Sequence, residues 1–117
     1  MSFAEITDGL SNTLMVGEKH VPQGRFGIGW LDSSIYNGNY TPPTCRSAGP
    51  DAPLASTLTE PSCVFGSYHR GICQFVFCDG SVHTLSYGLS DPAFTFTTVM
   101  WQLIRPSDGV PIASGDF

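Results

Sequence analysis

The clearest pattern of apolar and polar positions lies in residues 71–87, GICQFVFCDGSVHTLSY. Two strand-like runs meet there at Asp79-Gly80, a dipeptide typical of a two-residue hairpin turn. With that turn Phe77 lies opposite Val82. A three-residue loop with a bulge would change these partners and keep the alternation within each strand. The pattern predicts a central β-hairpin whose core face carries Cys73, Phe75, Phe77 and Val82.

A further strand is predicted near the N-terminus, in residues 6–19, ITDGLSNTLMVGEK. Either Thr7 or Asp8 can cap one short helical turn, because both side chains can accept a hydrogen bond from an amide two or three residues later. The apolar run from Thr13 to Val16 follows that turn. We therefore expect one helical turn and then a buried strand.

The apolar spacing becomes helical after residue 90. Asp91-Pro92 is a typical helix start, and apolar residues follow at positions 93, 96, 100, 103 and 104. The β-branched residues at 95 and 97–99 disfavour a helix, and Arg105-Pro106 ends it. We expect a helix over 92–104 beside the hairpin. The predicted fold class is α+β, with an antiparallel β-sheet, one helix in the C-terminal half and long loops.

Residues 20–62 show no regular period and hold most of the prolines. We expect the stretch 41–61 to be a long surface excursion, and such loops are usually functional or pinned in place. Cys45 and Cys63 flank it. The simplest pairing is a disulfide between these two, which would remove a few kcal/mol of unfolded-state entropy.

The two remaining cysteines, Cys73 and Cys78, lie on one predicted strand. Five residues of strand separate them by roughly 16 Å, beyond the roughly 7 Å between Cα atoms that a disulfide allows. They are therefore not expected to bond to each other. The open alternative is that both of them pair with the loop.

Length and charge narrow the possible partners. The chain of 117 residues is long enough for one domain, 1–117, and its formal charge is −5 with only five Lys and Arg. Such a chain is a poor partner for nucleic acid or for an anionic membrane surface. No run approaches the roughly 18 apolar residues of a membrane span. Met1-Ser2 looks like an artificial beginning, so we expect a targeting segment to precede it.

Four residues of types that zinc prefers follow at short intervals: His69, Cys73, Cys78 and His83. Cys73 and Cys78 are an odd number of strand positions apart and point to opposite faces of the sheet, which disfavours one shared metal site. A thiol enzyme would use one of these cysteines with a histidine and Asp79, but thiols inside strands are rarely exposed nucleophiles. We expect no metal, no cofactor and no catalytic residues.

The aromatic residues Trp30, Tyr36 and Tyr40 lie in the Gly- and Pro-rich region. They could form a platform for a glycan or a small solute, although such residues are more often half-buried loop anchors. They are the candidate ligand contacts of the sequence.

One motif carries a family resemblance. His69 is followed by nine residues and then Asp79-Gly80, in the setting FGSYH…FVFCDGSV. This closely resembles the prepilin-type processing-associated H-x9-DG domain, also called domain of unknown function 1559. Residues 6–18, ITDGLSNTLMVGE, resemble that family's other recurrent segment. From the spacing, we expect His69 to bond the backbone at the start of the strand and Gly80 to supply the turn at its other end.

The resemblance implies the head domain of a pilin-like or pseudopilin-like structural protein, exported to the periplasm or the cell surface. It implies a leader and a long apolar N-terminal helix, which would anchor the protein in the membrane and assemble it with other pilin-like subunits. The alternative from the residues is an extracellular module that binds a glycan or solute through the 20–62 region.

Overall fold

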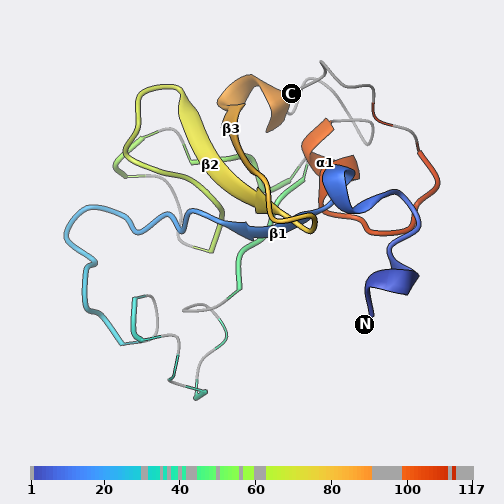
Figure 1. Cartoon of the computed structure of the whole chain (residues 1–117). Coiled ribbons are helices and arrows are strands. Elements are labelled where there is room, and N and C mark those ends of the chain that lie inside the picture. Colours follow the sequence, from blue (N-terminus) through green and yellow to red (C-terminus); the bar gives the residue numbers. More distant parts are fainter. Residues whose placement is uncertain are drawn as a thin grey trace.

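The computed structural model describes residues 2–29, 32–34, 36, 38–39, 41, 45–49, 51–55, 57–59, 63–90, 99–110 and 112. Its centre is a three-stranded antiparallel sheet in the order β1-β2-β3, formed by Leu14–Gly17, Ile72–Phe77 and Val82–Ser86 (Figure 1). The α-helix α1, Val99–Leu103, packs beside the sheet. Short 3-10 helices precede β1 at Phe3–Glu5 and Leu10–Asn12 and follow β3 at Tyr87–Ser90. The mixed α+β class is thus confirmed.

The hairpin of β2 and β3 exists, but its register differs from the one expected for a two-residue turn. Val76 lies opposite Val82, and the amide of Phe77 donates to the carbonyl oxygen of Ser81 at 2.9 Å. The loop therefore has three residues, and Gly80 at its end has φ 86°, the left-handed conformation that such a loop needs. Of the two loops considered from the sequence, the longer one is present.

This shift by one residue exchanges the two faces of β3. The core face of β2 carries Cys73, Phe75 and Phe77 as predicted, all almost fully buried. Val82 was wrongly expected beside them and is 64% exposed, whereas Leu85 is fully buried. A change of register by one residue reverses every side chain of a strand, because successive side chains point to opposite faces.

Strand β1 lies where the sequence predicted it, but it is not buried. Leu14 pairs with Phe77 and Val16 pairs with Val76, so Met15 forms a β-bulge between them. The bulge turns Val16 to the outer face of the sheet, and Met15 and Val16 are both more than half exposed. The expectation of a buried strand fails because an apolar run in the sequence does not reveal a bulge.

Helix α1 supplies the other side of the core. Met100 and Leu103 are fully buried, in agreement with the helical spacing, and they pack with the core face of the sheet. The amide of Arg105 donates to the carbonyl oxygen of Gln102 at 3.1 Å, and Pro106 follows. Residues 91–98, the first part of the predicted helix, lie outside the described residues.

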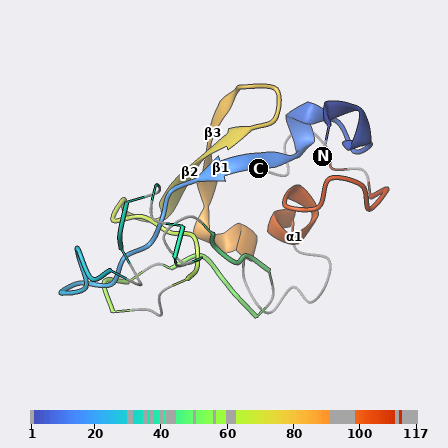
Figure 2. The same ribbon diagram turned by 90° about the horizontal axis from the view of Figure 1, so that it is seen from below.

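The stretch 41–61 is only in part a surface excursion. Ser47 forms a parallel bridge with Val64, and Ala55 forms one with Gly66, so part of the stretch runs along the chain that leads into β2 (Figures 1 and 2). Ala48, Leu54 and Ala55 are buried. Their few small apolar side chains help to fill the core, which corrects the expectation of a loop lying wholly on the surface.

Candidate functional site

The two segments that carry the family resemblance, residues 6–18 and 69–80, contact each other at both ends of β2. One is the start of β2, where Glu18 meets His69 and Gln74. The Glu18 carboxylate accepts a hydrogen bond from the amide of Gln74 at 2.6 Å and lies 3.3 Å from Nε2 of His69. The backbone amide of Glu18 also donates to the Gln74 carbonyl oxygen at 3.2 Å. His69 therefore holds the start of the strand through a carboxylate, whereas the sequence suggested a bond to backbone.

Cys73 lies beside this carboxylate and faces the core. Burial raises the pKa of the Cys73 thiol to about 12, and the nearby negative charge of Glu18 adds to the shift. The group is fully buried and stays protonated at neutral pH. A protonated, buried thiol is a poor nucleophile and behaves as a small core side chain.

The two segments meet again at the hairpin loop, beyond the far end of β2. The Asp79 carboxylate accepts hydrogen bonds from the amide and the hydroxyl of Ser81 at 2.8 and 2.6 Å, and these bonds lower the pKa of Asp79. The amides of Cys78 and Asp79 donate to the carbonyl oxygens of Thr13 and Leu10, at 2.8 and 3.1 Å. The N-terminal segment thus holds the hairpin loop through its backbone.

Asp8 joins the N-terminal segment to the chain after α1. Its two carboxylate oxygens accept hydrogen bonds from the amides of Asp108 and Gly109, at 2.7 and 3.1 Å. The helical turn expected after Thr7 or Asp8 is present at Leu10–Asn12, but it begins after Gly9 and has no side-chain cap. Asp8 instead accepts hydrogen bonds from Asp108 and Gly109, about a hundred positions later in the chain.

We expect Asp8 to make the protein sensitive to acid. Desolvation alone would raise the pKa of Asp8, but hydrogen bonds from Asp108, Gly109 and Thr7 together outweigh it and hold the pKa below its ordinary value of 3.8. A lowered folded-state pKa contributes stability that is complete above the unfolded-state pKa and is lost as the pH falls through the folded-state pKa. The free energy of unfolding should therefore fall below pH ~4.

The measurement is urea denaturation of Asp8→Asn and of the wild type between pH 7 and pH 2. The variant should lose less stability than the wild type as the pH falls below ~4. Asp51→Asn is the matched control, because the exposed Asp51 carboxylate makes no hydrogen bond to a residue that the structure describes. An Asp8→Asn profile parallel to the wild type would contradict this role.

The motif residues do not form one chemical site. His69 precedes β2 and Asp79-Gly80 follow it, so six residues of extended strand, about 20 Å, separate them. His83 lies edge-on to Phe77 with ring centroids 4.7 Å apart, and its Nε2 is 3.0 Å from the Ser81 hydroxyl. Within the described ranges, no group of three His, Cys, Asp or Glu side chains could hold a metal ion.

The other predicted site residues have different outcomes. Trp30 and Tyr40 lie outside the described residues, and Tyr36 is 92% exposed. The disulfide between Cys45 and Cys63 stays a prediction. The chain segments that contain Cys45 and Cys63 lie side by side. Ser47 forms a parallel bridge with Val64, and the Ser47 amide donates to the Cys63 carbonyl oxygen at 2.8 Å.

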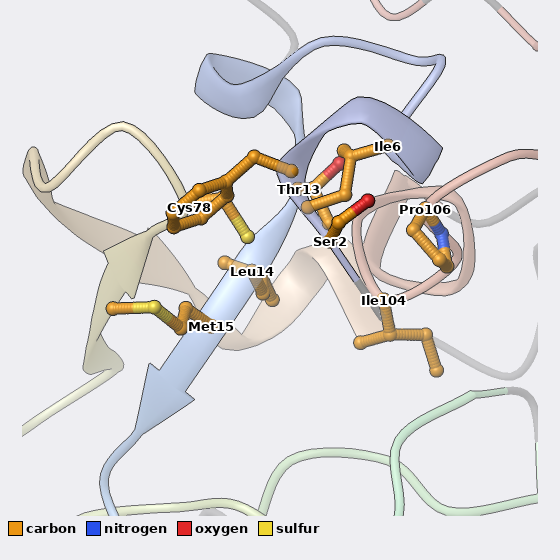
Figure 3. A pocket seen from close by; sticks show the side chains of 9 residues that line it. Ser2, Ile6, Thr13, Leu14, Met15, Cys78, Ile104 and Pro106 are labelled. Carbon is orange, nitrogen blue, oxygen red and sulfur yellow. The ribbon is translucent and has the colours of Figure 1, made fainter.

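The structure has a groove of about 550 Å³ beside β1, which no pattern in the sequence predicted. Its walls are mainly apolar and come from the N-terminal segment, β1, the hairpin loop and the end of α1. Figure 3 shows the side chains of Ile6, Leu14, Cys78 and Ile104 around it. Only the tertiary arrangement brings these residues together.

The outer face of the sheet carries a second apolar feature, a row of three valines. Val16, Val76 and Val82 lie opposite one another across β1, β2 and β3. Val16 and Val82 are 56% and 64% exposed, and Val76 is half-buried. We call Val16, Val76 and Val82 the valine row.

One family model places the chain among known proteins. The family model described as protein of unknown function (DUF1559) matches residues 1–91. Searches of curated proteins and of solved structures found no match. In the part of the chain that the structure describes, no helix is long and apolar enough to cross a membrane.

Proposed function

We propose that this chain is a non-catalytic structural subunit, and the premise is its family. The chain belongs to the DUF1559 family of proteins of unknown function. The assembly would be pilin-like or pseudopilin-like, at the bacterial cell surface or in a secretion apparatus. The subunit would be exported and anchored by an N-terminal helix that precedes these residues. The described chain would be its head.

The observation that carries the proposal is the valine row. Exposed apolar side chains that adjoin one another on a regular surface mark sites of protein association more often than isolated ones do. The three strands contain no Asp, Glu, Lys or Arg. Glu18 borders the valine row in the same hollow, but its carboxylate is engaged by His69 and the Gln74 amide, so the row itself suits an uncharged partner. A neighbouring pilin-like subunit with an apolar surface meets this requirement.

The roles of the motif residues support the same proposal. Glu18 binds His69 and the Gln74 amide, Asp8 binds two amides after α1, and Asp79 binds Ser81. Each of these groups holds backbone or a neighbouring side chain in place. These structural roles are those expected of a subunit that functions through its shape and not through a chemical reaction.

The test is photo-crosslinking from position 82 in a producing cell, with the complete gene expressed and a photoreactive amino acid replacing Val82. The expected product joins this protein to a second copy or to another protein with a processed pilin-type N-terminus, identified by mass spectrometry. Tyr36 is the matched control position, because it is more exposed and is not part of the valine row. Equal products from both positions, or no pilin-like partner at position 82, would contradict the proposal.

The second candidate is a module that binds a glycan or small solute, favoured by the 92% exposure of Tyr36. An exposed aromatic ring can stack on the apolar face of a sugar. Binding to an oligosaccharide array that Tyr36→Ala abolishes and Tyr68→Ala leaves intact would favour this function. An array without binding would exclude the glycan ligands tested.

A further inference from the structure

A second hollow, of about 300 Å³, lies next to the groove, and Arg46 is the charged side chain among the described residues that line it. Apolar residues of β1, together with Ala48, Phe65 and Ile104, form most of its remaining lining. Leu14, Met15 and Ile104 line both the hollow and the groove, so the two spaces are neighbours. Its size is at the lower end of the range of small-molecule sites, about 300–1,000 Å³.

The described residues satisfy little of the hydrogen-bonding capacity of the Arg46 guanidinium. Its Nε is buried without a hydrogen-bond partner among the described residues, and Nη1 donates at 2.8 Å to the carbonyl oxygen of the adjacent Cys45. Guanidinium carries five N–H donors in a planar fork. Nε is shielded from solvent, but the second N–H of Nη1 and both N–H groups of Nη2 have no partner among the described residues and can bind another group.

No carboxylate of the described residues forms an ion pair with Arg46. Asp32 is close enough to favour its charge, but the Asp32 carboxylate lies 2.6 Å from Nζ of Lys19 and also accepts the Gly27 amide. Burial lowers the pKa of Arg46, and Cys63, Asp32 and Cys45 offset this only in part. A half-buried cation without a carboxylate partner among the described residues is unusual in a chain with ten acidic and five basic residues.

We propose that this hollow binds a small monocarboxylate with an apolar body. Guanidinium pairs with carboxylate through two parallel hydrogen bonds, and such charge-assisted bonds are strong where water is excluded. The apolar walls suit a short acyl chain, and the neighbouring groove extends the apolar surface beyond the hollow. This inference does not rest on the proposed role in assembly.

The test uses the 117-residue chain and two probes, hexanoate and its uncharged analogue hexanamide, followed by NMR titration. Hexanoate should bind with a Kd of about 1 mM or tighter and shift the methyl signals of Ala48 and Ile104. Hexanamide should bind at least about tenfold more weakly, because it cannot form the charged pair. Equal binding of the two probes, or no binding of hexanoate, would overturn the proposal.

Variants of the arginine locate the site. Arg46→Met should reduce hexanoate affinity at least about tenfold, whereas Arg70→Met, at an exposed arginine, should leave it unchanged. Arg46→Lys keeps the charge and removes the fork, so it should also weaken binding while keeping the fold. If Arg46→Met does not fold, Arg46→Lys provides the test. An affinity of Arg46→Lys for hexanoate equal to that of the wild type would overturn the proposal.

Discussion

Leu85→Ala should lower the free energy of unfolding by about 2–5 kcal/mol, whereas Val82→Ala should change it by less than about 0.5 kcal/mol. Leu85 is fully buried among the core residues, so its truncation leaves a cavity that the surroundings fill only in part. Val82 is 64% exposed on the same strand and loses few contacts. Urea denaturation of both variants measures the difference.

This pair of variants also tests the register of the hairpin. A two-residue turn would place Val82 on the core face and Leu85 on the outer face. If Val82→Ala cost as much as Leu85→Ala, the three-residue loop and the valine row would both be wrong.

Gly17→Ala should lower the free energy of unfolding by about 1–3 kcal/mol. A Cβ atom on Gly17 would lie 2.4 and 2.5 Å from Cε1 and Cδ1 of Phe75 and 2.8 Å from Cδ1 of Phe65. The two rings pack edge-to-face with centroids 5.4 Å apart, and Phe75 is 1% exposed. Neither ring can move away without disturbing the core.

The matched control is Gly88→Ala. Among the described residues, a Cβ atom there meets only the Ser86 hydroxyl, at 3.6 Å, which is ordinary van der Waals contact. Thermal and urea denaturation should therefore show a smaller loss, below about 1 kcal/mol. Similar losses in both variants would mean that the rings of Phe75 and Phe65 do not restrict position 17, and would contradict the close packing.

The three strands could be predicted from the sequence, but the register of β3 and the exposure of β1 and β3 could not. The alternation in residues 72–77 fixes which side chains of β2 share a face, and Cys73, Phe75 and Phe77 are buried as expected. Two- and three-residue loops both place Asp79-Gly80 at the tip of a hairpin. The three-residue loop is held by the local Asp79–Ser81 hydrogen bonds and by backbone hydrogen bonds to the N-terminal segment, and the latter are tertiary.

In the candidate site as well, residues within one motif could be predicted, whereas contacts between distant parts of the chain could not. His69 and Gly80 could be identified from the motif, and Gly80 supplies the turn as expected. Glu18, the partner of His69, was not identified, although it closes the other segment of the family resemblance. Two recurrent segments at a distance in sequence were a signal that their polar residues could meet. Arg46 gave no such signal, because its surroundings come from four separate parts of the chain.

Glu18 and His69 join the two motif segments into one structural unit. The most direct measurement is a double-mutant cycle of Glu18→Ala and His69→Ala, with the free energy of unfolding measured in urea. We expect the double variant to lose roughly 0.5–1 kcal/mol less than the sum of the single variants, a modest coupling because the His69 side chain is 55% exposed. Losses that add without coupling would contradict the account and leave the motif histidine without its structural role.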